Sequence, residues 1–252
     1  MPGASAVSEA LAKPPAAVKQ QGRIPRYLYS MTLAARIDHT LLRPDCTEAQ
    51  IAQLCQEAAA HGFASVCVPP CYVAFATEQL AGTNVPVCTV IGFPLGYAAS
   101  KVKFKEAEVA LYDGAHELDL VINISALKSG RTGAIQAEIL DLADLCHVHQ
   151  SLLKVIIETA LLTEAEIELA CQLCVAGEAD FVKTSTGFAS RGASVADVEL
   201  MRRVLPENVR IKAAGGIRTR EAALALVAAG AERIGSSNSI ALIALTDEST
   251  AA

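Results

Sequence analysis

The chain of 252 residues carries 21 basic and 27 acidic residues, a net charge of −6, and 52% of its residues are hydrophobic while only 4% are aromatic. A nucleic-acid partner is not expected, because nucleic-acid backbones bind to basic fields. No apolar run reaches the ~18 residues of a membrane span and no secretory signal opens the chain, so we expect a cytoplasmic protein that does not bind membranes.

Residues 1–25 are rich in Ala, Pro, Gln and Ser and show no sustained period, so a flexible tail is expected there, followed by a single domain over residues 26–252. In the domain, short apolar runs alternate with longer helical patterns, which is typical of repeated βα units. The expected strands are centred on residues 37–39, 65–68, 87–91, 117–121, 153–157, 181–184, 209–212 and 233–235. Eight parallel strands close a barrel, so we predict a (β/α)8 TIM barrel with outer helices.

Helix boundaries agree with this count. Thr47 with Gln50 and Thr163 with Glu166 form capping-box patterns, each of which opens a helix after a strand and loop. Four glycines each follow a helical stretch and precede a strand, where a left-handed backbone would end the helix: Gly62, Gly114, Gly177 and Gly230.

Two lysines stand near the ends of the sixth and seventh expected strands, Lys183 and Lys212. In a TIM barrel the active site lies at the carboxyl ends of the strands, so their side chains can meet there. Alternation along the strands brings Asp119 and Asp38 toward the same interior, and Lys154 can join them. It also places Phe181 on the face of Lys183, and Arg210 below Lys212 at the lower rim of the barrel.

Two lysines on adjacent strands would lower each other's affinity for a proton. At ~6 Å and an effective dielectric of ~20 their repulsion is ~2.8 kcal/mol, or ~2 pKa units, and burial adds to it. An amine that is partly neutral near pH 7 can form a Schiff base, so we assign Lys183 as nucleophile and Lys212 as its electrostatic activator and proton relay. The alternative is that both are ordinary ion-paired lysines at strand ends.

Small residues follow the last three strands: Gly187, Gly215, Gly216, Gly235, Ser236 and Ser237. The loops after strands seven and eight are the habitual phosphate site of the barrel, and glycine lets backbone N–H groups approach an anion closely. Together with the lysines they indicate a pocket for a small phosphorylated carbonyl compound. The alternative is that these glycines only form tight turns.

The eight cysteines are expected to be reduced thiols. Neither Cys171 and Cys174 in a helical pattern nor Cys146 with His147 and His149 assembles four tetrahedral metal ligands, so no metal is expected. His39 follows Asp38 and should point out of the barrel, toward a helix.

Seven segments, residues 37–42, 67–69, 91–96, 117–123, 153–159, 180–188 and 212–219, carry a resemblance to a known family. Over about residues 36–240 the chain resembles the deoxyribose-phosphate aldolases, class I aldolases that need neither metal nor cofactor. The resemblance implies reversible cleavage of 2-deoxy-D-ribose 5-phosphate to D-glyceraldehyde 3-phosphate and acetaldehyde, a step of deoxyribonucleotide catabolism. Its partners would be the phosphorylated sugar, acetaldehyde and further copies of the chain, foremost in a dimer.

The same resemblance implies roles for single residues. Lys183 matches the Schiff-base lysine, Lys212 the second lysine, and Asp119 the acid/base residue that works through a water. Asp38 and Thr186 would bind sugar hydroxyls, and the six small residues above would hold the phosphate. Cys67 matches a family cysteine that lines the barrel. The family often has Gly-Thr/Ala-Ser-Ser/Ala-Gly where this chain has Gly235-Ser236-Ser237-Asn238-Ser239. Some members end in an active-site tyrosine that is absent here, so proton transfer would rest on Asp119, Lys212 and water.

Three other readings fit parts of the pattern. A pyridoxal-phosphate barrel also uses a Schiff-base lysine and a phosphate cup, but it would purify yellow. A silent phosphosugar-binding barrel would not need both lysines. A class I aldolase with a ketose substrate differs in the carbonyl compound that becomes trapped on the protein.

Overall fold

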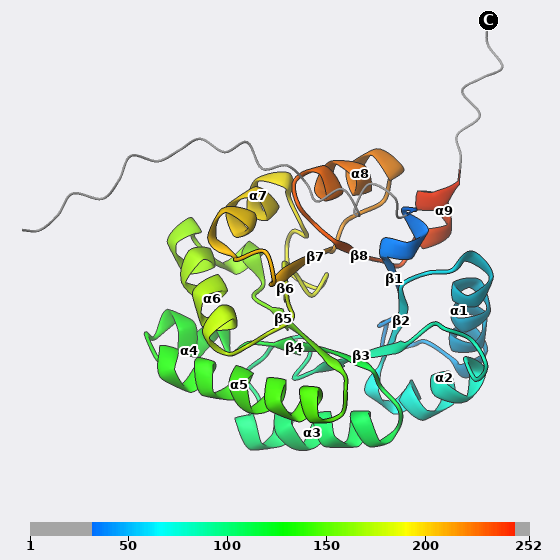
Figure 1. The fold of residues 1–252 in the computed structure, drawn as a ribbon, viewed down its shortest axis with the longest axis horizontal. Helices are drawn as coiled ribbons and strands as arrows, with labels where there is room; N and C mark the ends of the chain where they lie inside the picture. The colour runs from blue at the N-terminus through cyan, green and yellow to red at the C-terminus, as the bar shows by residue number, and fades with distance from the viewer. Residues whose placement is uncertain (1–31, 245–252) are drawn as a thin grey trace, which may run out of the picture.

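Eight parallel strands form a closed barrel with helices around it, as the sequence predicts (Figure 1). The structure, a computed structural model, describes residues 32–244; the tail predicted for residues 1–25 lies outside them. In chain order the strands are β1 (Ile37–Thr40), β2 (Ser65–Val68), β3 (Val87–Ile91), β4 (Glu117–Val121), β5 (Leu152–Ile156), β6 (Phe181–Lys183), β7 (Arg210–Ala214) and β8 (Arg233–Ser236).

The helices form the outer layer. They are α1 (Glu48–His61), α2 (Val73–Gln79), α3 (Ser100–Tyr112), α4 (Ile124–Lys128), α5 (Thr132–Val148), α6 (Glu164–Ala176), α7 (Val195–Val204), α8 (Arg220–Ala228) and α9 (Ser239–Ile243). Short 3-10 helices occupy Ala34–Arg36, Pro70–Tyr72 and Thr159–Leu161. No helix in residues 32–244 is long and apolar enough to cross a membrane.

Apolar and charged residues divide between two layers. Alternate strand residues such as Leu118 and Leu120 of β4 face the helices and belong to one large apolar core. Inside the barrel, Cys67, Cys88 and Val90 form a small apolar cluster, and the buried Phe181 ring lies against Arg210 and Arg233. Most aliphatic side chains of the strands face the helices, whereas the buried charged ones face the interior.

Most helix boundaries follow the predicted signals. Thr47 and Thr163 both form complete capping boxes, and Gly62 ends α1 with a left-handed φ of 63°. Gly177 differs, because its φ is −96°. A Cβ at Gly177 would lie 2.6 Å from Ile139 Cγ2, so packing of α6 against α5 and not backbone conformation requires glycine there.

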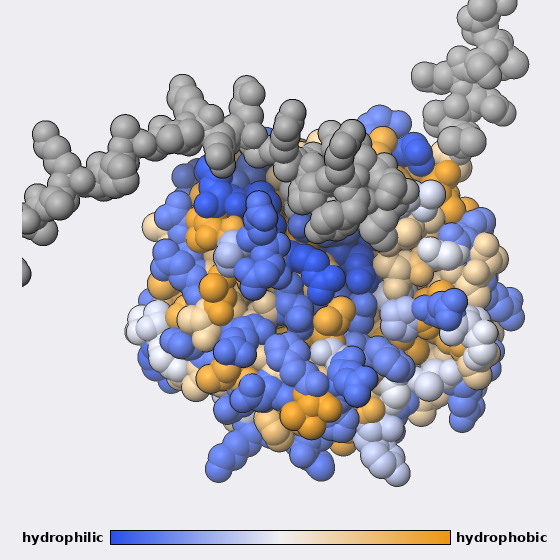
Figure 2. All heavy atoms as spheres, viewed as in Figure 1, coloured by the Kyte–Doolittle hydropathy of each residue, from blue (hydrophilic) through white to orange (hydrophobic). Residues whose placement is uncertain are grey.

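A buried ion pair ties α3 to α5. Lys103 Nζ lies 2.7 Å from Glu138 Oε1 and also donates to the Val121 carbonyl at 2.8 Å, at the end of β4. Ser100 Oγ donates to the other oxygen of Glu138. On the face of the molecule shown in Figure 2, polar side chains predominate and apolar ones form small separate patches.

Candidate active site

Three strands bring the two lysines and Asp119 into direct contact. Lys183 and Lys212 are paired residues on β6 and β7, so they enter the barrel at one level. Lys183 Nζ donates to Asp119 Oδ2 at 2.8 Å, and Lys212 Nζ donates to the same oxygen at 2.6 Å. All three side chains are buried. The predicted grouping of amines is therefore present, with a carboxylate between them.

Asp38 and Lys154 complete the centre of the barrel. Lys154 Nζ donates to Asp119 Oδ1 at 2.9 Å, and Lys212 Nζ lies 2.5 Å from Asp38 Oδ2. This buried Asp38 oxygen accepts no hydrogen bond within residues 32–244, because its ammonium neighbours contact it without hydrogen-bond geometry. Asp38 Oδ2 is thus held by ion pairs with Lys212 and Lys154, at 2.5 and 3.9 Å.

Charge pairing outweighs burial at these groups. Burial alone would raise the pKa of Asp119, but the ammonium groups of Lys154, Lys183 and Lys212 hold it well below its usual value. Burial would likewise lower the pKa of Lys212, but Asp119 and Asp38 raise it above its usual value. Lys212 is thus a cation beside Lys183, and its pKa moves opposite to the lowering expected from repulsion between the two lysines alone, because two carboxylates contact it. The Asp119 charge offsets part of the repulsion between the two amines.

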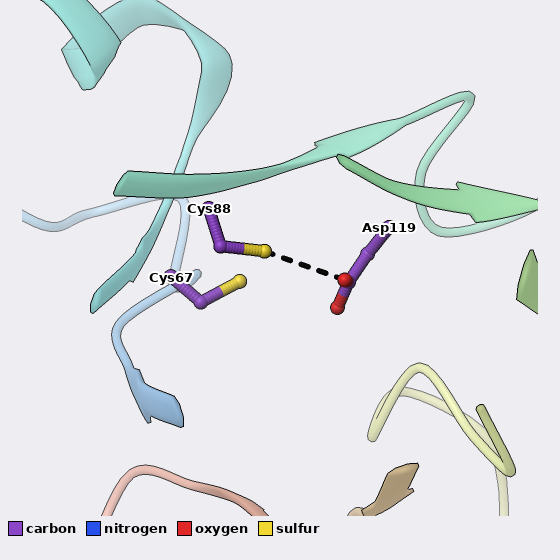
Figure 3. Close-up of side chains that lie close together, drawn as sticks. All are labelled: Cys67, Cys88 and Asp119. Atoms are coloured by element: carbon purple, nitrogen blue, oxygen red, sulfur yellow. Dashed lines mark hydrogen bonds between the residues drawn. The ribbon is translucent and has the colours of Figure 1, made fainter. Parts of the chain in front are cut away.

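Two thiols line the barrel next to Asp119 (Figure 3). Cys67 on β2 and Cys88 on β3 point toward Asp119, and Cys88 Sγ donates to Asp119 Oδ1 at 3.3 Å. Burial raises the pKa of Cys88 well above its usual value. The two sulfurs and an Asp119 oxygen lie within 4.8 Å of one another, a spacing that suits a metal ion. The three ammonium groups on Asp119 already supply cations there, which disfavours metal binding.

Glu158 restricts the hydrogen bonds that Thr186 can offer to a ligand. Thr186 lies in the loop after β6, and both its backbone N–H and its hydroxyl donate to Glu158 Oε2. The Thr186 hydroxyl can therefore accept a hydrogen bond from a ligand but has no proton left to donate. The buried Glu158 has a left-handed φ of 56°, and its Oε1 has no hydrogen-bond partner in the described residues.

The loops after β6 and β7 touch each other through glycines. A Cβ at Gly215 would lie 3.0 Å from Gly192 Cα and 3.2 Å from Gly187 Cα, and Gly215 has a φ of +86°. Both the close approach of the two neighbouring backbones and the left-handed φ therefore require glycine at position 215. Gly187 and Gly216 are exposed with left-handed backbones, so their surfaces remain open to a ligand.

The phosphate-binding residues predicted in and after β8 differ in exposure: Gly235 and Ser236 are buried, whereas Ser237 is exposed. Gly235 lies inside the strand, where a Cβ would be 3.3 Å from Lys212 Cε, so its small size leaves room for the Lys212 side chain. Ser236 donates its hydroxyl to the Ile217 carbonyl at 3.3 Å and accepts from the Asn238 backbone.

Residues expected outside the site lie outside it. The His39 ring contacts Glu57 of α1 at 2.7 Å and Ser239 at 2.9 Å, on the helix side of β1. Arg210 stacks on the Phe181 ring at 3.9 Å and is half-exposed, which agrees with a place at the rim. Cys146 is buried in α5 while His147 and His149 are exposed, so these three do not converge.

Glu117 and Arg233 belong to the interior but were not predicted there as charged groups. Arg233 donates to Asp38 Oδ1 at 2.5 Å and to Glu117 Oε2 at 3.1 Å, and Lys154 lies 2.7 Å from Glu117. Glu117 stands two residues before Asp119, and this alternation was the available signal. Arg233 and Glu158 carry no comparable local signal.

Comparison with known proteins gives one consistent result. The model of the DeoC/LacD family of aldolases matches residues 32–240. Deoxyribose-phosphate aldolase 1 of Bacillus licheniformis is 50% identical over 211 residues, which cover 84% of this chain and 94% of that one. The deoxyribose-phosphate aldolase of Enterococcus faecalis is 50% identical over 213 residues, with 84% and 96% covered.

A solved structure agrees with these sequences. The tetrameric deoxyribose phosphate aldolase of Aeropyrum pernix superposes with a TM-score of 0.79 at 35% identity, covering 84% of this chain and 89% of that chain. The family match extends over all eight strands and over each residue of the lysine and aspartate cluster. This chain belongs to the DeoC/LacD family of aldolases.

Proposed function

We propose that this chain is a class I deoxyribose-phosphate aldolase in which Lys183 forms the Schiff base. The observation that carries the proposal is the contact of two buried amines with one oxygen of Asp119. This arrangement holds a nucleophile, a fixed cation and a proton acceptor in a single enclosed site. The reaction cleaves 2-deoxy-D-ribose 5-phosphate reversibly to D-glyceraldehyde 3-phosphate and acetaldehyde.

In the synthetic direction, neutral Lys183 adds to the carbonyl carbon of acetaldehyde, and loss of water gives an iminium ion. Asp119, acting through a water, takes a proton from the methyl carbon, and the electron pair of that C–H bond forms an enamine. The enamine carbon attacks the aldehyde carbon of glyceraldehyde 3-phosphate, whose oxygen takes up a proton. Water then releases the product from Lys183. The iminium nitrogen accepts the electrons that a free carbanion would have to carry.

Substrate contacts would use acceptors and backbone groups at the site, and Asp38 Oδ2 would share its place beside Lys212 with a sugar hydroxyl. Asp38 Oδ2 and the Thr186 hydroxyl can accept hydrogen bonds from sugar hydroxyls. The exposed backbone of Gly187 and Gly216, together with Gly215 and Ser237, would hold the phosphate. Gly235 and Ser236 support this loop from within β8, since their space and hydrogen bonds serve Lys212 and Ile217.

Two further properties belong to the same proposal. All eight cysteines are free thiols, which fits work in the reducing cytoplasm. We expect a homo-oligomer, because the related Aeropyrum pernix enzyme is described as a tetramer.

The decisive experiment is reduction with borohydride in the presence of acetaldehyde, followed by peptide mass mapping. The expected result is a two-carbon adduct on the peptide that contains Lys183, and its loss in Lys183→Leu. An adduct on Lys212 would exchange the two roles, and a ketose-derived adduct without one from acetaldehyde would favour an aldolase for ketoses. A yellow preparation would favour a pyridoxal-phosphate enzyme.

A further inference from the structure

Six charged side chains inside the barrel form a closed ring in which positive and negative groups alternate; we call it the charge ring. Its contacts run from Arg233 to Glu117 at 3.1 Å, Glu117 to Lys154 at 2.7 Å, Lys154 to Asp119 at 2.9 Å, Asp119 to Lys212 at 2.6 Å, Lys212 to Asp38 at 2.5 Å and Asp38 to Arg233 at 2.5 Å. The members come from β1, β4, β5, β7 and β8, so only closure of the barrel assembles them.

The charge ring is balanced in itself. Three cations and three carboxylates alternate, and their side chains are between 0% and 12% exposed, so little water screens them. Each cation in the ring contacts at least two carboxylates. Removal of a proton from either ring lysine would therefore break at least two buried ion pairs.

Lys183 stands outside this balance. Its amine contacts the ring only at Asp119 Oδ2, and that oxygen is already bonded to Lys212. No other carboxylate in residues 32–244 lies within 4.0 Å of the Lys183 amine. A proton on Lys183 adds one positive charge to a buried cluster that is neutral without it. Loss of one proton from any of the four interior cations would balance the total charge, but Lys183 contacts one carboxylate whereas each of the others contacts at least two. Neutral Lys183 therefore breaks the fewest ion pairs.

We propose that Glu117 and Arg233 are positioning residues that close the charge ring and thereby determine that Lys183, and not Lys154 or Lys212, is the neutral amine. The inference rests on the proposed function in one respect, that Lys183 is the nucleophile. Arg233 orients Asp38 by donating a hydrogen bond to Oδ1. Glu117 accepts a hydrogen bond from Arg233 and forms an ion pair with Lys154, so it links these two cations.

Every other strand of the barrel contributes a charged or titratable group to the interior that surrounds Lys183. These groups are Asp38 on β1, Cys67 on β2, Cys88 on β3, Glu117 and Asp119 on β4, Lys154 on β5, Lys212 on β7 and Arg233 on β8. Glu117 and Arg233 have opposite charge and contact each other, so their separate removal should act on Lys183 in opposite directions.

The test measures the pH dependence of borohydride trapping of acetaldehyde on the full chain. The neutral amine reacts, so the trapping rate rises with pH through the titration of the nucleophile. Glu117→Gln leaves an excess positive charge, which disfavours the ammonium form, and the rising limb should move to lower pH. Arg233→Met leaves an excess negative charge and should move it to higher pH. We expect about 1 pH unit each way, the effect of one charge about 12 Å away at a dielectric of about 20.

Three controls separate charge from packing. Glu117→Gln combined with Arg233→Met restores neutrality and should return the limb to the wild-type position, as should Arg233→Lys. Phe181→Leu alters the volume beside Arg233 without a change of charge and should leave the limb in place. If the rising limbs of the pH profiles of Glu117→Gln and Arg233→Met coincide, or move in the same direction, while the adduct still forms on Lys183, the proposed role of the charge ring is wrong. Absence of any adduct on Lys183 in the wild type overturns the proposed function itself.

Discussion

Asp119 is the residue on which most interactions of the site converge. It contacts the amines of Lys154, Lys183 and Lys212 and the thiol of Cys88. We predict that Asp119→Asn still forms the trapped adduct on Lys183, because loss of the carboxylate leaves excess positive charge that favours the neutral amine. Turnover should fall at least ~100-fold, since the group that moves the carbon-bound proton is lost.

The measurement compares trapping yield with steady-state cleavage of the phosphorylated sugar. Asp141→Asn, on the exposed side of α5, is the matched control and should leave both unchanged. Undiminished cleavage in Asp119→Asn would remove Asp119 from the proton transfer.

Side-chain direction separates the residues that the sequence could identify from those that it could not. Lys183, Lys212, Asp119 and Asp38 were predictable, because a charged group within an apolar strand has only the barrel interior to face. Their contact with a common carboxylate oxygen was not predictable, since it depends on rotamers set by neighbours from other strands. The commitment of the Thr186 hydroxyl to Glu158 was hidden for the same reason.

At the level of elements, the strands were predictable within one or two residues because each is a short apolar run between helical patterns. The differences lie at their ends: β6 stops at Lys183 and β7 continues to Ala214. The burial of Lys103 is not predictable from the sequence, because a lysine in an amphipathic helix normally faces water. Only the packing of α3 over the end of β4 buries it.

The Lys103–Glu138 pair makes α3 and α5 depend on each other. Lys103→Met leaves the buried Glu138 carboxylate with only the Ser100 hydroxyl as donor, and we predict a loss of about 3–5 kcal/mol in unfolding free energy. Lys103→Met with Glu138→Leu should recover much of that loss, because no charge then remains buried.

Urea denaturation of the single and double variants measures both changes. Lys105→Met is the control on the same helix, since Lys105 is 73% exposed and pairs with Glu108 at the surface. Its effect should stay within about 0.5 kcal/mol. A double variant as unstable as Lys103→Met would show that packing, and not an unpaired charge, causes the loss.

For the whole molecule, the number and order of the strands determined the fold, since eight successive βα units close in only one common way. The charge ring depends on how the closed barrel staggers its strands. Glu117 and Arg233 contact each other across the interior from β4 and β8, which lie four strands apart in the barrel order. Local residue spacing does not indicate such a contact. The sequence therefore predicts the lysines and aspartates of the site but not the Glu117–Arg233 contact that closes the charge ring.

The buried thiols predict how the stability of the whole molecule responds to alkali. Burial raises the pKa of Cys146 in α5 and of Cys171 in α6 to about 12, and that of Cys174 well above its usual value. In the unfolded chain these thiols ionise near pH ~8.5. Their contribution to stability is therefore fully present below that pH and is lost as pH rises toward the folded values, by up to ~1.4 kcal/mol per thiol per pH unit.

Urea denaturation from about pH 7 to about pH 11 should show this decline. Cys171→Ala with Cys174→Ala should make it shallower, whereas Cys71→Ala, at the exposed cysteine, should not. An unchanged slope in the double variant would mean that other groups, such as the ring lysines, dominate alkaline unfolding.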